Sequence, residues 1–248
     1  MKQVNTIFIL VVTISLLMTS CFREDEPLPP YVSPPGVHTT SANMGPLYGK
    51  QLFYDLETDS FIRIIDRDSW DLAFSAEDNQ HAIFLNSSKF MRVVNTGSTN
   101  FSQTFSSAGW EWRIDNSGGW PDSTAIGEWG NVNQLNVVSN QYVYLIDRGY
   151  TANGNVIGYK KLQVIELTNQ TYKVRFANLD GSQEQTISLN KDAAYNFLFL
   201  SFTQGIVEIE PPKAEWDLLF SQYATPVLQE STGIYEDYSV NGILLNPY

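Results

Sequence analysis

The sequence predicts an all-β fold, an antiparallel two-layer β-sandwich-like domain with few or no helices. Residues 172–177 alternate apolar and polar side chains, and residues 207–210 do the same, as half-buried antiparallel strands require. From about residue 47 onward, no stretch keeps a helical period over three turns. Residue pairs that favour hairpin turns separate the strand-like runs; they are Asn153-Gly154, Asn169-Gln170 and Asp180-Gly181.

The chain is long enough for one large β domain. Among its 248 residues are 6 Trp, 13 Tyr and 14 Phe, and its 43% of hydrophobic residues can fill a sizeable core. Residues 195–202 are apolar at nearly every position, which predicts a central strand covered on both faces. A strand of this kind implies packed layers of sheet.

A short repeat also indicates strands. Residues 69–75, with the sequence SWDLAFS, recur as EWDLLFS at residues 215–221. A period of two would place Trp70, Leu72 and Phe74 on one face of a strand and the aspartate on the other, and the second copy likewise. We interpret each copy as the anchor of a core layer.

Charge and cysteine content exclude several classes of function. The chain has 15 Lys+Arg against 27 Asp+Glu, a net charge of −12, and no basic stripe, which argues against nucleic acid as a partner. Its one cysteine, Cys21, allows no internal disulfide. With two histidines, His38 and His81, and no Gly-x-Ser-x-Gly motif, the sequence gives no support for a hydrolase. We therefore predict a protein that is not an enzyme.

The N-terminus predicts a lipoprotein. Residues 1–20 resemble a secretory signal peptide, with an apolar run too short to span a bilayer. The run ends at Cys21 in a pattern that resembles a bacterial lipobox, so we expect Cys21 to be lipidated and to anchor the chain to a membrane. Residues 21–46 are acidic and proline-rich and form the expected stalk, which leaves residues 47–248 as the single domain.

The acidic residues just after Cys21 resemble the export signal of surface lipoproteins of the Bacteroidetes. The expected location is therefore the outer membrane with the domain at the cell surface. The alternative is the periplasmic face.

A tryptophan-rich segment is the first candidate for binding. Residues 110–129 hold Trp110, Trp112 and Trp120 beside several turn-forming residues, which predicts a long loop. Aromatic side chains on loops commonly contact a planar ligand, a sugar or a protein. Alternatively, Trp112 and Trp129 cover the core.

Several blocks of sequence together resemble the HmuY family of haem-binding lipoproteins of the Bacteroidetes. The blocks are residues 67–74, 84–88, 124–129, 142–149, 158–162, 211–218 and 240–245. The resemblance implies an all-β fold, capture of haem at the cell surface and delivery to a TonB-dependent outer-membrane receptor. Characterised members hold the iron with paired His or Met residues on loops between the two copies of the repeat.

Those ligands do not transfer to this chain, because residues 100–215 contain no His, Met or Cys. His81 and Met91 are the candidate axial ligands, since a His/Met pair is competent to bind haem iron. The mature chain also contains His38 and Met44, and a tyrosine could supply a phenolate; the tyrosines considered are Tyr142, Tyr144, Tyr150 and Tyr159.

Trp110, Trp112, Trp120 and Tyr142 are the candidate residues of a ligand loop. No metal is expected beyond haem iron. The alternative hypothesis is a surface lipoprotein on the same scaffold that binds no haem and engages a protein or glycan through the aromatic loop.

Overall fold

The computed structural model describes residues 38–247 of the chain. Backbone contacts divide the chain into Met1–Thr40 and Ser41–Tyr248, and the fold given below is that of the second unit. The predicted signal peptide, Cys21 and most of the predicted stalk lie outside the described residues. Within the described part, no helix has the length and apolar character needed to cross a bilayer.

The described residues form antiparallel strands joined by turns and four short 3-10 helices, which confirms the all-β prediction. The strands are β1 (Lys50–Asp55), β2 (Ser60–Asp66), β3 (Leu72–Ser75), β4 (Ile83–Leu85), β5 (Arg92–Asn95), β6 (Gly130–Asn133), β7 (Asn136–Ser139), β8 (Val143–Asp147), β9 (Tyr159–Thr168), β10 (Thr171–Ala177), β11 (Gln185–Asn190), β12 (Phe197–Ser201), β13 (Gly205–Val207), β14 (Leu218–Gln229) and β15 (Ile234–Leu245). The 3-10 helices are η1 (Pro46–Tyr48), η2 (Ser87–Lys89), η3 (Pro121–Ser123) and η4 (Lys213–Glu215).

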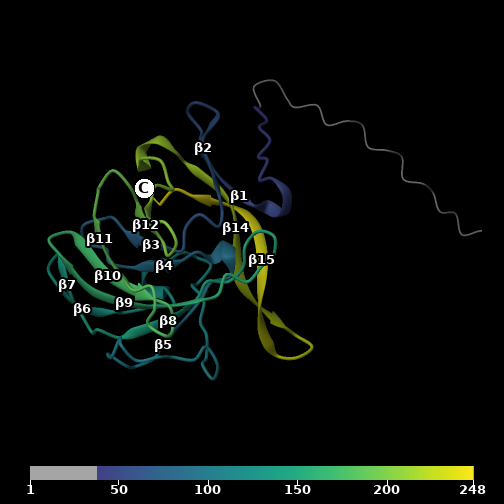
Figure 1. Ribbon diagram of the computed structural model, residues 1–248. Coiled ribbons are helices and arrows are strands. Elements are labelled where there is room, and N and C mark those ends of the chain that lie inside the picture. Colours follow the sequence, from purple (N-terminus) through teal and green to yellow (C-terminus); the bar gives the residue numbers. More distant parts are fainter. Residues whose placement is uncertain (1–37, 248) are drawn as a thin grey trace, which may run out of the picture. The chain divides into compact units, whose positions relative to one another are not determined.

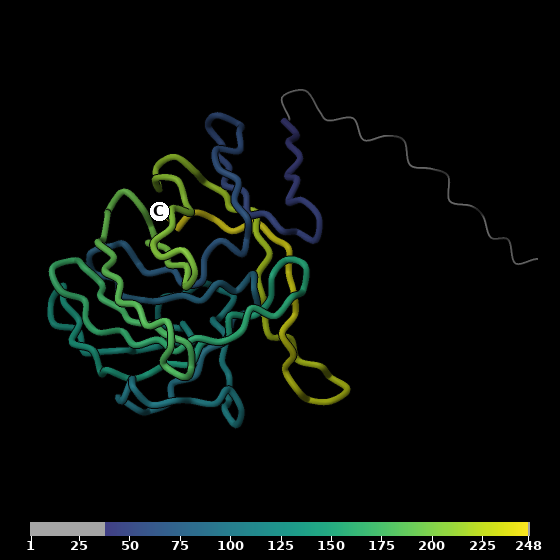
Figure 2. The backbone as a smooth tube through the Cα atoms, in the orientation of Figure 1, coloured from purple at the N-terminus to yellow at the C-terminus, as the bar shows by residue number. Residues whose placement is uncertain are grey.

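The strands assemble into three sheets. Sheet A has the order β15-β14-β1-β2 and sheet B the order β13-β12-β3-β4. Sheet C has the order β11-β10-β9-β7-β6, with β8 paired to β9 and β5 paired to β8. The β14–β15 hairpin is the longest, and its distal half projects from the sheets, as the chain path shows (Figure 1, Figure 2).

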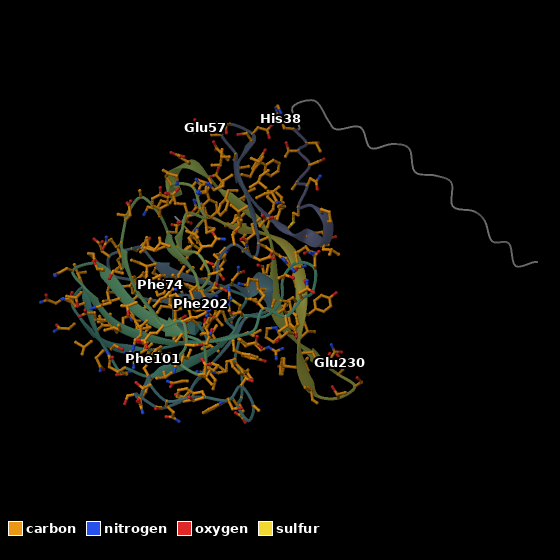
Figure 3. The ribbon with its side chains drawn as sticks, in the orientation of Figure 1. His38, Glu57, Phe74, Phe101, Phe202 and Glu230 are labelled. Carbon is orange, nitrogen blue, oxygen red and sulfur yellow. The ribbon has the colours of Figure 1, made fainter. Side chains whose placement is uncertain are left out.

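Sheet B is the middle layer of the unit. Leu72, Phe74 and Leu200 on one of its faces belong to the main core, which they share with sheet C. Ala73 and Phe199 on the other face pack in a second cluster with residues of sheet A. A third cluster covers the outer face of sheet C. Phe74 and Phe202 lie within the body of the unit (Figure 3). The predicted sandwich therefore carries a third layer.

Strand β12 shows why residues 195–202 are apolar at successive positions. It lies between β13 and β3, with sheets on both sides. Phe197 and Phe199 face the cluster shared with sheet A, whereas Leu198 and Leu200 face the main core. The prediction of a central strand covered on both faces is confirmed.

The predicted turns are also found where strands reverse. Asn169 and Gln170 join β9 to β10 and both have positive φ, 50° and 61°, as a two-residue hairpin turn requires. Asp180-Gly181 lies between β10 and β11, and Asn153-Gly154 lies in the loop closed by the bridge between Tyr150 and Val156.

The repeat departs from simple alternation in both copies. Leu72 and Phe74 share a face, but Trp70 lies on the opposite side with Ala73. Trp216 likewise joins the cluster of Leu219. The reason is that each strand begins two residues after its tryptophan, at Leu72 and Leu218, so the tryptophan lies outside the pleat. The predicted placement of each Trp with the next two apolar residues is wrong.

The prediction for residues 207–210 is wrong for a similar reason. Strand β13 ends at Val207, and beyond it both Ile209 and Glu210 are buried, each 3% exposed. The Glu210 carboxylate accepts hydrogen bonds from the backbone N–H groups of Asn196 (2.5 Å) and Phe197 (2.8 Å). The alternating pattern of residues 207–210 therefore does not correspond to a half-exposed strand.

Asp71 of the first repeat copy lies at the centre of a buried ion cluster. Its carboxylate accepts hydrogen bonds from Lys89 Nζ, from Arg148 Nε and Nη2 (both 3.0 Å), and from the backbone N–H of Phe202 (2.7 Å). Asp71 and Lys89 are fully buried. Burial alone would raise the pKa of Asp71, but the two cations and their hydrogen bonds outweigh it, so the pKa is lowered.

Asn86 and Gly149 hold the chain around this cluster. The Asn86 side chain donates to the carbonyl oxygens of Arg67 (2.8 Å) and Trp70 (2.9 Å). Gly149 has a positive φ of 65°, and a Cβ there would lie 1.8 Å from the Lys89 carbonyl oxygen. Only glycine permits this approach of the two backbones.

Replacing Asp71 by Asn should lower the free energy of unfolding by about 3–5 kcal/mol, because Lys89 and Arg148 would remain buried without their carboxylate. Urea denaturation followed by circular dichroism measures the loss. The matched control is Asp217→Asn in the second repeat copy. That half-buried carboxylate accepts one N–H, from Leu56 (2.8 Å), and its loss should cost about 1 kcal/mol or less. Equal losses in the two variants would contradict the assignment.

Candidate functional site

A cleft of about 480 Å³ lies between the β14–β15 hairpin and residues 112–114, near the start of the tryptophan-rich loop. Trp112 and Ile114 line one side, and Pro226 and Tyr235 of the hairpin line the other. Arg92 at the start of β5 also lines it. Glu236 and Asp237 of the hairpin line it as well, so the cleft combines apolar and aromatic side chains with one cation and two acids.

The position of Trp112 follows from the packing beneath it. Trp110 and Trp112 pack against the cluster on the outer face of sheet C, which includes Phe101 and Phe105. The ring of Trp112 also contacts Tyr159 of β9, with centroids 5.8 Å apart. The segment is therefore anchored to the sheet, while part of the Trp112 side chain remains accessible at the cleft.

Arg92 connects the two sides of the cleft. Its Nη2 donates to Asp237 Oδ2 at 2.6 Å, across from β5 to the hairpin. The Arg92 side chain is 44% exposed, so the guanidinium retains donors that face solvent. A second contact, between the hydroxyls of Ser117 and Thr225 (2.9 Å), holds the loop to the hairpin. Both contacts fix the width of the cleft.

The remaining candidate residues of the loop do not gather at this cleft. Trp120 is 66% exposed and lines a different hollow, described below. Trp129 is fully buried in the main core, as the alternative interpretation of the loop expected. Tyr142 packs against the same core. Of the four predicted loop residues, the structure places Trp110 and Trp112 together.

His81 and Met91 lie in different surroundings. Met91 is 1% exposed and belongs to the main core. The His81 side chain is 24% exposed, its ring packs edge-on against Trp129 with centroids 6.3 Å apart, and its Nε2 is 3.7 Å from Glu128. Neither residue lines the cleft. Among the described residues, no three His, Cys, Asp or Glu side chains are grouped as a metal site would need.

Sequence reasoning missed Arg92, Pro226 and Tyr235. Arg92 and Tyr235 lie far apart along the chain and meet because the hairpin folds back over β5. No local motif marks either residue.

A larger hollow of about 540 Å³ is more polar. It is lined by Arg148, Lys160, Phe202 and residues of the turn after β10. Arg148 is already committed to the buried carboxylate of Asp71, and Lys160 donates to Asn178 Oδ1 at 2.6 Å. This hollow offers less apolar wall to a flat ligand than the cleft at Trp112.

A cavity of about 190 Å³ lies between sheets A and B. Its walls are mainly aromatic and include Phe53, Trp70, Phe199 and Trp216, and Glu210 lies at one end. A neighbouring hollow of about 300 Å³ is lined by Trp120 and by polar side chains. Phe84, Gly119 and Phe197 line both spaces, so the two adjoin.

Fold and cleft together define an all-β binding domain. A family model described as HmuY protein matches residues 47–190, more than half of the chain. The chain therefore belongs to the HmuY family. The match includes Arg92 and Trp112 of the cleft and ends before the β14–β15 hairpin. No curated protein and no solved structure matches the chain.

Glu210 should make stability depend on pH. Burial raises the pKa of its carboxyl group to about 7, against the opposing hydrogen bonds from Phe197 and Asn196. Between the ordinary value of 4.5 and about 7, the folded state keeps a proton that the unfolded state has lost. This group therefore makes the protein less stable as pH rises through that window, by about 3 kcal/mol at most.

Glu210→Gln keeps an oxygen that can accept both N–H groups and removes the titration. The fall in melting temperature from pH 4.5 to pH 7.5 should be smaller in this variant than in the wild type. Glu208→Gln is the matched control, because Glu208 is exposed and two residues away. A wild-type slope that Glu210→Gln leaves unchanged would show that Glu210 ionises freely in the folded protein.

Proposed function

We propose that this protein is a surface lipoprotein that binds haem non-covalently and passes it to a TonB-dependent outer-membrane receptor. Membership of the HmuY family supports haem, or a closely related tetrapyrrole, as the ligand. The observation that carries the mode of binding is the cleft between the loop and the hairpin. There the rings of Trp112 and Tyr235 can contact a flat macrocycle from opposite walls.

The residues of the cleft suit the periphery of haem better than its iron. Arg92 can exchange Asp237 for a haem carboxylate, because arginine binds carboxylates through paired N–H donors. It must do so against the repulsion of Glu236 and Asp237, which line the same cleft. The lining residues include no His, Met or Cys, and the phenol oxygen of Tyr235 is the one side-chain group among them of a type that ligates haem iron. Binding in this proposal rests on ring contacts and charge pairing, with no covalent chemistry and no enzymatic step.

A haemin titration of residues 22–248, followed by the Soret band, tests the proposal. The wild type should give a saturable shift. Trp112→Ala and Tyr235→Ala should each weaken binding by about tenfold, because each removes one aromatic wall. Tyr238→Ala is the matched control, since Tyr238 is 60% exposed on the same strand and does not line the cleft. Its binding should equal that of the wild type.

Two further variants separate the modes of binding. Arg92→Gln should weaken haemin binding, and the effect should shrink at high salt, because its contribution is electrostatic. His81→Ala should leave the Soret band unchanged; a loss would instead assign His81 as a ligand and move the site away from the cleft. A wild type without any shift beyond free haemin would reject haem and favour the alternative, a protein or glycan ligand of the aromatic loop.

The membrane anchor is part of the same proposal. We infer that Cys21 carries lipid and holds the domain at the outer membrane, on a stalk made of the acidic and proline-rich residues that follow. Cys21→Ala should release the protein into the soluble fraction, as fractionation with an antibody would show. Protease added to intact cells should digest the wild type if the domain faces outward. Membrane association unchanged by Cys21→Ala would contradict the lipoprotein assignment.

A further inference from the structure

The cavity between sheets A and B is a half-open pocket, and it is larger than the gaps that facing sheets usually leave. Facing sheets normally interdigitate their side chains and leave few voids larger than a water molecule. Here the facing side chains of β1, β3, β12 and β14 leave about 190 Å³. An apolar cavity of roughly 150 Å³ is enough to bind benzene. The space therefore has room for a molecule of one or two aromatic rings.

The walls of the cavity favour an aromatic ligand. Trp70 packs edge-on against Phe199, with centroids 5.1 Å apart, and Trp216 packs edge-on against Phe53 at 5.0 Å. These rings line the space together with Phe84. Rings arranged in this way present both faces and edges, and an added ring can make the same offset or edge-on contacts.

The polar groups at the walls set the charge of the ligand. The indole N–H of Trp70 donates to Gln51 Oε1 at 2.9 Å, whereas that of Trp216 is buried and has no acceptor among the described residues. Because less than 1 Å² of that nitrogen is accessible, a ligand in the cavity does not reach it. No cation is among the described side chains that line this cavity or the adjoining hollow, so nothing there pairs with an anionic ligand. A neutral ligand fits this environment.

The adjoining hollow gives a route from solvent. Phe84, Gly119 and Phe197 line both spaces, and Trp120 lies at the outer one with 66% of its surface exposed. Gly118 supports the ring of Trp120, because a Cβ at Gly118 would lie 2.6 Å from Trp120 Nε1. The indole therefore packs directly on glycine backbone at the entrance.

From these observations we propose that the cavity between sheets A and B binds a small neutral aromatic molecule of one or two rings. The molecule enters past Trp120 and packs between Trp70 and Trp216. This site shares no lining residue with the cleft proposed for haem. It is independent of the proposed function, so either can fail alone.

Titration with the neutral naphthyl ketone Prodan tests the site, because its emission moves to shorter wavelength in an apolar environment. The wild type should give a saturable shift. Ala73→Leu places a larger side chain on the cavity wall and should weaken binding by about tenfold or more. Ala194→Leu, the same substitution at an exposed turn, is the matched control and should bind as the wild type does.

Two variants keep the test decisive if Ala73→Leu does not fold. Trp216→Phe replaces the indole wall with a smaller ring and should weaken binding of the ketone by several-fold, because it removes part of the aromatic contact area. Trp120→Ala changes an exposed side chain at the entrance and should alter the rates of binding and release. As competitors, the neutral 2-acetylnaphthalene should displace Prodan and the anionic 2-naphthoate should not.

The proposal is overturned by any of three results. The first is a wild type that gives no saturable shift, and the second is folded Ala73→Leu and Trp216→Phe variants that bind as tightly as the wild type. The third is competitive displacement of Prodan by haemin, which would place the ketone in the haem cleft. Conversely, Prodan binding that persists when Tyr235→Ala has lost haemin binding would separate the two sites.

Discussion

The ion cluster around Asp71 is the interaction on which the arrangement of layers depends. One carboxylate joins the start of β3, the end of η2, the end of β8 and the end of β12, through Lys89, Arg148 and the N–H of Phe202. These segments belong to sheets B and C or connect them. Burying three charges is costly, and the cost is offset only when every donor and acceptor is paired. The cluster therefore specifies one relative position of the two sheets.

The ion cluster around Asp71 also gives a structural role to several of the sequence blocks that resemble the HmuY family. Residues 67–74 contain Asp71, residues 84–88 contain Asn86, and residues 142–149 contain Arg148 and Gly149. Asn86 caps the turn beside the cluster, and Gly149 allows the close approach to Lys89. The blocks thus encode the framework. This is why family membership could be predicted from the sequence although the predicted haem ligands could not be transferred.

Periodicity predicted the parts of the fold in which a strand keeps the same buried face and the same exposed face along its length. The strand at residues 171–177 and the turn at Asn169-Gln170 were predicted because alternation and turn chemistry are local. The faces of Trp70 and Trp216 were not, since each lies before its strand begins and outside the pleat. Glu210 was mistaken for an exposed residue because its buried backbone partners, Asn196 and Phe197, come from another strand.

The candidate sites could not be predicted, because both form between segments that are distant in sequence. The cleft needs Arg92 and Trp112 to meet Tyr235 on the hairpin, and nothing near any of these residues signals the others. For the cavity, however, the repeat was a partial signal. It brings Trp70 and Trp216 to one cluster between sheets A and B, where two large rings stand beside the small side chains of Ala73 and Ser221.

The two large rings and the small side chains beside them account for the cavity between sheets A and B. Large rings at the edges of a facing pair of sheets hold the backbones apart, while small residues between them cannot fill the gap. The cavity is thus a consequence of the repeat itself, in which each copy contributes a tryptophan that its strand does not include. Sheet B is covered on its other face by the main core and is tied to sheet C through Asp71. The constraint that orders sheets B and C therefore also positions the wall that sheet B gives to the cavity.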